Sequence, residues 1–298
     1  MATLREIRRR IGGIKSTQKI TKAMKMVAAA KLRRAQDAVI AARPYARTIR
    51  TLVSHLSAVS SVDEHPLFRE REMNSVAIIV ITSDRGLCGA FNSNVIKKTI
   101  HHIEERYHSL NSSGNVHLLC IGKKGSDYFQ KNHYNVIGKF TGILHEMNYV
   151  NAQRVMGDVT AKFLNGEYDR VEILYNEFES IIHQRIVIEP LLPLSLENLR
   201  AFAGDAGPKR AAYSIYEPSL PSILTALLPK QLNFQMWHAM LESNASEQGA
   251  RMTAMDNATS NAAELIRTLQ LSYNKARQAS ITKELLEIVS GAEALRNA

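Results

Sequence analysis

A turn with two glycines, Thr82–Asn92 (TSDRGLCGAFN), is the first segment whose residue types and spacing could support chemistry. It follows a β-branched run and precedes a helical pattern, and backbone N–H groups at such a junction can bind phosphate. The turn contains neither G-x-G-x-x-G nor G-x-x-x-x-G-K-[ST], the patterns of nucleotide-binding turns. We therefore interpret it as a tight structural turn or a docking loop.

Other candidate groups for chemistry are weaker. The segments Gly122–Ser126 (GKKGS) and Gly12–Ser16 (GGIKS) also lack the phosphate-binding pattern. His101 and His102 are adjacent on a polar helix face, with no His or Glu partner at the spacing of metal ligands. No paired carboxylates and no nucleophile–base set stand out. The sequence therefore predicts a non-catalytic protein without a metal site or cofactor.

Composition places the chain among globular proteins with room for about two domains. Of its 298 residues, 45% are apolar, and no apolar run approaches the ~20 residues of a membrane span. Cys88 and Cys120 are too few for a disulfide framework, so we expect two buried thiols. The charged start lacks the apolar segment of a secretory signal, which favours the cytosol. A mitochondrial transit peptide is the alternative, but the helical repeat begins at Leu4 and does not pause.

Positive charge is concentrated at the N-terminal end. Residues 1–50 hold fourteen Lys or Arg and two acids, a net charge of +12, whereas the whole chain carries +10. Acids for i,i+4 pairing are missing, so the charges repel one another unless a partner meets them. Such a helix is typical of proteins that bind phosphate, anionic lipid or an acidic protein surface. A solvated helix face is the simpler alternative.

The elements that position these charges begin with a heptad repeat over residues Leu4–Leu56. Thirteen of its sixteen core positions are apolar, and the three exceptions, Gln18, Thr21 and Lys25, are close together. Seven heptads predict a coiled-coil helix roughly 80 Å long, which needs a partner helix. Pro44 lies inside the repeat and should bend the helix without ending it.

Strand and helix patterns alternate between residues 75 and 188, which predicts a mainly parallel α/β sheet. The last two strands are only a couple of residues apart and should form an antiparallel hairpin at its edge, with the second closing at Glu189–Pro190. The predicted strands are Ser75–Thr82, Val116–Ile121, Tyr134–Phe140, Arg170–Phe178 and Ile181–Ile188, and the predicted helices are residues 95–107, 126–132 and 150–164.

A second long heptad pattern follows a linker over residues 195–218. It steps by fours and threes from Leu241 to Ala276 and then slips by one residue to Ile281. The predicted fold is therefore an antiparallel coiled coil of the terminal helices with an inserted α/β (Rossmann-like) domain. The corresponding domains are residues 1–62, 63–215 and 216–298.

Two functions compete at this point. A nucleic-acid binder would lay its basic helix along a phosphate backbone, but Tyr45 is the single aromatic residue in the first fifty and offers little stacking surface. A cytoskeletal or scaffold coiled coil would leave the inserted α/β domain without a purpose.

Three motifs resemble one family, the gamma subunits of F-type ATP synthases. They are Ile11–Arg34 (IGGIKSTQKITKAMKMVAAAKLRR), the turn SDRGLCGAFN, and Tyr273–Ala292 (YNKARQASITKELLEIVSGA). The resemblance implies a central rotor shaft whose terminal helices pass through a ring of three alpha and three beta subunits. It also implies contacts of the α/β domain with the epsilon subunit and the c-subunit ring. Proton flow through that ring would then drive ATP synthesis at the beta subunits.

The same resemblance implies a location and a set of contacts. The chain would lie on the cytoplasmic face of the bacterial inner membrane as a peripheral protein, with no nucleic-acid partner and no membrane insertion. Met24 matches a methionine near an acidic loop of beta, and Arg251 matches its basic neighbour. Lys25 replaces a Glu of some relatives and would add a cation there. The polar positions that affect coupling in the family correspond to Gln278, Thr282 and Glu284.

The coiled-coil pattern adds a geometric expectation. If Met24 faces Arg251 in the antiparallel pair, Met1 falls opposite Asn274, and residues 277–298 continue as a lone helix. That helix would present apolar side chains that need a bearing from another subunit, namely Ile281, Leu285, Ile288 and Leu295.

Overall fold

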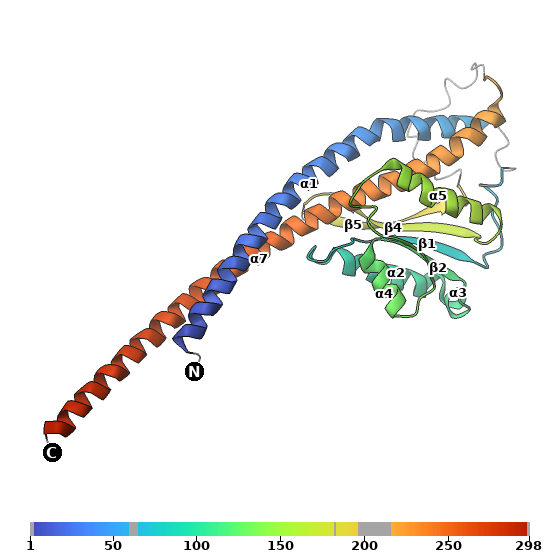
Figure 1. Cartoon of the computed structure of the whole chain (residues 1–298). Helices are drawn as coiled ribbons and strands as arrows, with labels where there is room; N and C mark the ends of the chain where they lie inside the picture. The colour runs from blue at the N-terminus through green and yellow to red at the C-terminus, as the bar shows by residue number, and fades with distance from the viewer. Residues whose placement is uncertain (1–2, 60–64, 182, 196–215, 297–298) are drawn as a thin grey trace. The chain divides into compact units, whose positions relative to one another are not determined.

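The computed structural model describes residues 3–59, 65–181, 183–195 and 216–296 (Figure 1). Two long helices, α1 (Leu4–Val59) and α7 (Leu220–Arg296), flank the α/β elements in the sequence. The chain divides into two compact units, one formed by Met1–Ala28 with Met252–Ala298 and the other by Ala29–Arg251. Both long helices contribute residues to both units. The predicted combination of paired terminal helices and an inserted α/β domain is confirmed.

The second unit contains a five-stranded sheet of order β3-β2-β1-β4-β5. Strands β1 to β4 are parallel, and β5 runs antiparallel to β4 at the edge, as the sequence predicts. The strands are β1 (Val76–Ile81), β2 (Val116–Ile121), β3 (Val136–Phe140), β4 (Arg170–Phe178) and β5 (Gln184–Leu192).

Burial explains why β1 reads as an uninterrupted apolar run. All six of its residues are buried, because helices cover both faces of the sheet (Figure 1). One face packs against α2 and α4, and the other against α5 together with parts of α1 and α7 that belong to this unit. The shorter helices are α2 (Phe91–Arg106), α3 (His108–Ser112), α4 (Lys123–Lys131) and α5 (Tyr149–Leu164).

Two details differ from the sequence prediction. Strand β5 does not close at Pro190 but continues to Leu192. Proline is tolerated there because β5 is an edge strand and the ladder shifts register between Val171 and Glu172. The short helix α3 was not predicted. Of the predicted linker, residues 196–215 lie outside the described residues.

In the second unit, α1 and α7 pack through apolar side chains. Tyr45 and Phe234 place their ring centroids 5.2 Å apart, and Ile49 and Val53 are buried in the same core as Leu228. Helix α1 passes through Pro44 without ending, as predicted. From Ala239 to Ala250 nearly every residue of α7 is buried, so this part of the helix is enclosed within the unit.

The first unit is an antiparallel pair formed by the start of α1 and the end of α7 (Figure 1). Thr21 contacts Thr259, and Lys25 contacts Asp256, so paired positions add to 280 or 281. The less exposed residues of both helices are those of the predicted heptads. On α1 they are Leu4, Ile7, Ile11, Ile14, Gln18, Thr21, Lys25 and Ala28, joined by Met24, and on α7 they include Met255, Thr259, Ala262, Ile266, Leu269, Tyr273 and Ala276.

The observed register corrects the expected one. Met24 is level with Asp256, whereas the expected register placed it opposite Arg251, a difference of about five residues. Leu4 is then level with Ala276, and the partly covered positions of α7 extend to Ser280. The expected register was wrong because it was set by one pair of family positions, while a heptad pattern alone fits several registers.

Candidate functional site

Two parts of the structure carry the candidate functional residues, and the first is the turn Thr82–Asn92. Asp84 occupies the N-terminus of α4, where its Oδ1 accepts the Lys123 N–H at 3.0 Å and its Oδ2 accepts the Gly142 N–H at 3.1 Å. Thr82 Oγ1 accepts the Gly125 N–H at 2.9 Å. Backbone groups that could bind a phosphate are therefore used by side chains of the same chain.

Close backbone approach makes this arrangement specific. Gly122 has a φ of +95°, and a Cβ at this position would lie 1.9 Å from the Thr82 carbonyl oxygen. A residue with a side chain cannot be accommodated there without moving β1 or α4. The first glycine of the GKKG sequence is therefore required by the close packing of α4 against the carboxyl end of the sheet.

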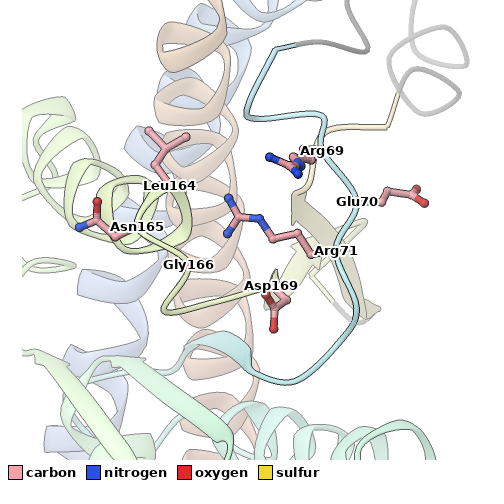
Figure 2. A pocket seen from close by; sticks show the side chains of 7 residues that line it. All are labelled: Arg69, Glu70, Arg71, Leu164, Asn165, Gly166 and Asp169. Carbon is pink, nitrogen blue, oxygen red and sulfur yellow. The ribbon is translucent and has the colours of Figure 1, made fainter.

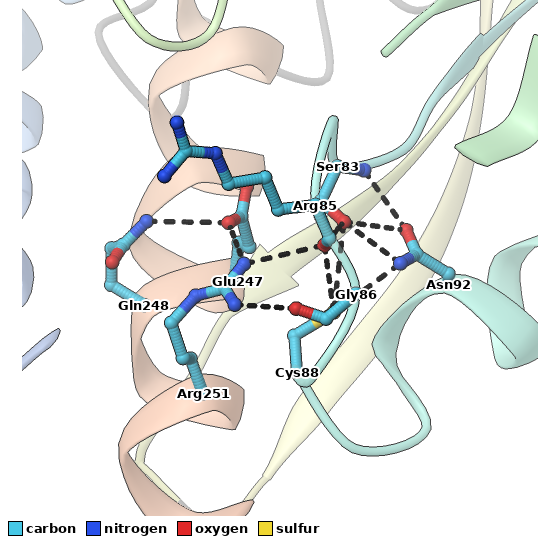
Figure 3. Close-up of polar contacts among 8 residues, drawn as sticks. All are labelled: Ser83, Arg85, Gly86, Cys88, Asn92, Glu247, Gln248 and Arg251. Atoms are coloured by element: carbon cyan, nitrogen blue, oxygen red, sulfur yellow. Dashed lines mark hydrogen bonds and ion pairs between the residues drawn. The ribbon is translucent and has the colours of Figure 1, made fainter. Parts of the chain in front are cut away.

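The turn is held against α7 by Arg251 (Figure 3). Its Nη1 donates to the Gly86 carbonyl at 2.6 Å, and its Nη2 pairs with Glu247 Oε1 at 2.5 Å. On the other side of the turn, Asn92 Oδ1 accepts the Ser83 N–H at 2.9 Å. The turn is thus fixed at both ends, and Arg251, which the resemblance assigned to subunit coupling, makes its described contacts here.

Burial sets the electrostatics beneath the turn. Desolvation raises the pKa of Glu247, aided by the charge of Asp84, although Arg251 opposes the shift. Desolvation also raises the pKa of the Cys88 thiol. Both cysteines of the chain are buried and free, as predicted. The buried Cys88 thiol therefore belongs to the packed interior of the turn. The outer surface of the turn faces away from this cluster.

The outer surface of the turn combines an apolar tip with cations. Leu87 is 66% exposed and has a φ of 65°, which is unusual for a residue with a side chain. The Arg85 side chain extends away from the hydrogen-bonded cluster in Figure 3, and a Cβ on Gly86 would lie 3.8 Å from Lys124 Cε. A positive φ costs free energy in a residue with a side chain, and it persists where the surrounding contacts fix the backbone. The contacts of the turn therefore hold Leu87 outward.

One expectation about the histidines was wrong. His102 is buried, not part of a polar surface, and its Nε2 lies 2.6 Å from Glu172 Oε2. Tyr107 donates to Glu172 Oε1 at 2.9 Å, and Arg170 Nε donates to the same oxygen at 2.8 Å. Burial alone would raise the pKa of Glu172, but these hydrogen bonds and charges outweigh it and lower the pKa. The network joins the C-terminal end of α2 to β4.

A shallow pocket of about 560 Å³ lies beside the end of α5 (Figure 2). Arg71 crosses it, donates from Nη1 to the Phe163 carbonyl at 2.8 Å and stacks on the Phe163 ring. Asp169 accepts the N–H groups of Asn74 and Ser75 at 2.9 Å each. These groups brace the segment that leads into β1, so the pocket is part of the scaffold.

The second candidate part is the helix pair of the first unit. Lys25 is not a free cation, because its Nζ lies 2.6 Å from Asp256 Oδ1. Gln278 and Thr282 are exposed on α7, and Thr282 Oγ1 donates to the Gln278 carbonyl at 3.0 Å. Glu284 is exposed as well. The sequence did not single out Asp256, Thr259 or Asp84 as functional residues, because their partners are far away in the sequence. Glu247 was not singled out either, although its partner Arg251 is only four residues away.

Beyond Ser280, α7 is exposed on all sides as far as Ala292. The exposed fractions of Ile281, Leu285 and Ile288 are 49%, 57% and 67%. Leu286 and Val289 are exposed to a similar degree. The side chain of the fourth predicted bearing residue, Leu295, lies outside the described residues. An apolar helix end without a partner in its own unit is typical of a docking element.

Within the described ranges, no three His, Cys, Asp or Glu side chains gather where they could hold a metal ion. Over the same residues, no helix combines the length and apolar character needed to cross a membrane. The fold belongs to the class in which antiparallel terminal helices carry an inserted α/β domain.

Comparison with known proteins identifies the family. A family model described as ATP synthase matches residues 3–295. The chain is 50% identical to the ATP synthase gamma chain of Chlorobium phaeobacteroides over 99% of its length and 100% of that protein. It is 49% identical to the gamma chain of Salinibacter ruber, with 99% of each chain covered. The chain therefore belongs to the ATP synthase gamma chain family.

Solved structures agree with this assignment. The central stalk of the Tetrahymena thermophila mitochondrial ATP synthase, solved with its c-ring, contains a chain that is 27% identical, with a TM-score of 0.63. The match covers 80% of this chain and 99% of that one. A chain of the Euglena gracilis enzyme shares the fold, with a TM-score of 0.67 at 22% identity over 98% and 94% of the two chains. The protein is a non-catalytic rotor subunit of the central stalk.

Proposed function

We propose that this chain couples proton flow through a membrane-embedded c-subunit ring to ATP synthesis at the beta subunits. In this proposal the helix pair turns inside a ring of three alpha and three beta subunits. The α/β domain contacts the epsilon subunit and the c-ring. The Tetrahymena central-stalk structure, which includes a c-ring, supports the last partner. The chain would lie at the cytoplasmic face of the bacterial inner membrane, as a peripheral protein held by these contacts.

The exposed end of α7 is the observation that carries the proposal. Ile281, Leu285 and Ile288 follow directly after the last partly covered position of the helix pair, Ser280. Burial of a large apolar side chain contributes roughly 1.5–3 kcal/mol. A helix that leaves several of them in water is stabilised when another protein surrounds it. We infer that residues 281–292, continued by Leu295, turn in an apolar bearing.

Contacts along the shaft complete the proposal. Met24 and Lys25 are partly covered residues of α1, and Lys25 pairs with Asp256 of α7. These residues lie close to the Ala28 end of the first unit. The uncompensated positive charge of the first fifty residues suits an acidic surface on beta. Arg251 acts by fixing the turn Thr82–Asn92, whose tip presents Leu87 and Arg85 to a neighbouring subunit. Gln278, Thr282 and Glu284 form the polar set at the entrance of the bearing.

Assembly of the bearing provides the test. We expect the double substitution Leu285→Asp with Ile288→Asp to weaken assembly with alpha and beta subunits, because two charges would enter an apolar sleeve. Lys275→Asp is the matched control, since it changes the net charge by the same amount at an exposed position of the same helix before the bearing segment. Co-purification in a 3:3:1 ratio is measured for each. Equal assembly of both variants would overturn the bearing.

A further inference from the structure

The segment Gly12–Thr17 of α1 contains two adjacent glycines that no contact with the described residues requires. They are the only glycines of α1. Both lie in helical backbone, so neither supplies a positive φ. Both are exposed, and a Cβ built on either would meet no described atom within 4 Å outside the backbone of α1. Alanine would therefore fit at Gly12 and Gly13, and it is a much better helix former than glycine.

Two hydroxyl groups weaken the same part of the helix. Ser16 Oγ donates to the Gly12 carbonyl at 3.2 Å, and Thr17 Oγ1 donates to the Gly13 carbonyl at 3.1 Å. Such a hydroxyl shares its carbonyl with a backbone N–H of the helix, and bonds of this kind often bend helices. Combinations of glycine and serine are also common positions of helix kinks. Residues Gly12–Thr17 therefore resist bending less than an ordinary helical turn.

The rest of the helix pair does not share this weakness. Residues 22–36 of α1 (KAMKMVAAAKLRRAQ) are nearly all strong helix formers. The paired positions described above place residues 263–269 of α7 (AELIRTL) level with Gly12–Thr17. Most of these are strong helix formers as well, and α7 has no glycine between Gly249 and Gly291. Only one of the two helices is therefore weak at this level.

We propose that Gly12–Thr17 is a flexible joint in α1. The segment Leu4–Ile11 changes its direction at this joint relative to the rest of α1, while α7 continues past it as a regular helix. Ile11 and Ile14 remain partly covered on the side that faces α7, so the apolar contacts hold the two helices together when α1 bends. The joint is a property of the chain itself and does not depend on the partners proposed above.

Close packing against another subunit is the competing explanation for the two glycines. A partner whose backbone lies directly on the outer face of α1 would also require residues without side chains. In that case the contacts with α7 would keep α1 as straight as α7 in the isolated chain. Bending of the isolated full-length chain therefore separates the two explanations.

Spin labels at exposed positions measure this bending. Arg9→Cys with Lys22→Cys places the labels on either side of the joint, and Asn257→Cys with Gln270→Cys places them along the facing part of α7. The two residues of each pair are thirteen positions apart, which is about 20 Å along a straight helix. Pulsed electron–electron double resonance gives the distribution of that distance. Both native cysteines are buried, and the chain without added cysteines reports their background labelling.

In the parent chain we expect the distance distribution across the joint to be at least about twice as wide as the distribution along α7. Gly12→Ala with Gly13→Ala should narrow it to the width found along α7, because alanine favours the straight helix. Lys15→Ala with Lys19→Ala is the matched control, since it changes two exposed residues of the same stretch and keeps the glycines. The control should retain the parent width. Equal widths across the joint and along α7 in the parent chain, or a width that the alanine pair leaves unchanged, would overturn the proposal.

Discussion

At the scale of single residues, the side chains that the family resemblance associates with coupling make different kinds of contact in this chain. Arg251 binds the Gly86 carbonyl and Glu247, so it holds a turn in place. Lys25 is neutralised by Asp256. Thr282 and Gln278 remain on the surface. A change in coupling caused by Arg251 could therefore act through the turn Thr82–Asn92.

Arg251→Ala should destabilise the second unit by about 1–3 kcal/mol, because hydrogen bonds to a charged group are lost. Glu247 limits the loss by taking up a proton, since burial already raises its pKa. Urea unfolding measures the stability, and amide exchange reports the turn. Arg251→Lys is the control, which keeps the charge but cannot reach two acceptors at once. Unchanged exchange in the turn after Arg251→Ala would contradict the holding role.

At the scale of elements, buried polar groups decide how helices sit on the sheet. Apolar periodicity places α2 against β1 and β4, but the position along the strand is set by His102 and Tyr107 bonding to Glu172. Because Arg170 also bonds to Glu172, the carboxylate is fully satisfied although only 1% of it is exposed. A buried carboxylate in this state must stay ionised to keep its partners.

The lowered pKa of Glu172 gives a pH dependence with a definite sign. Its contribution to stability is present above the unfolded-state pKa of roughly 4.3 and is lost as the pH falls through its lower folded value. Glu172→Gln should cost about 1–3 kcal/mol at neutral pH. It should also flatten the fall of stability in acid.

Urea midpoints measured from about pH 6 to pH 3 give both effects. Glu105→Gln is the matched control, because Glu105 pairs with His101 on the exposed side of α2, the helix that also carries His102. Parallel acid profiles for Glu172→Gln and the parent chain would show that Glu172 is not held ionised by this network.

At the scale of the whole molecule, each long helix has one segment in the helix pair of the first unit and another segment in the second unit. Helix α7 also has an exposed end. Residues 255–276 of α7 alternate between covered and exposed positions, whereas residues 281–292 are exposed throughout. A helix of that length without a partner is marginal in water. The end of α7 should therefore be the least stable helical part of the isolated chain.

Amide exchange should be fast beyond about residue 280 in the isolated chain and slow over residues 255–276, because pairing with α1 protects the latter. Adding alpha and beta subunits should slow exchange beyond residue 280, because Ile281, Leu285 and Ile288 become buried. The α/β strands, already protected, serve as the reference within the same experiment. Equal protection of the end of α7 with and without partners would mean that it is covered by this chain itself.

The sequence by itself determined the two long helices, the existence of the five strands and the class of protein. The heptads of α1 and α7 are readable because burial repeats with the period of a helix. Strand β1 is readable because both of its faces are covered, which produces an uninterrupted apolar run. The apolar residues after Ser280 are readable because the helical pattern continues there. Family motifs at both ends and in the turn Thr82–Asn92 indicated that the chain is the rotor subunit. Comparisons that cover nearly the whole chain confirm this assignment.

Only the tertiary structure decided the register of the helix pair, the burial of His102 and the partner of Arg251. In each case the deciding contact joins residues far apart in the sequence, such as Thr21 with Thr259 or Arg251 with Gly86. Apolar periodicity specifies which face of a helix is covered but is nearly unchanged by a slip of one heptad. Hydrogen bonds and ion pairs are directional and short, so the Thr21–Thr259 and Lys25–Asp256 contacts identify the register of the pair.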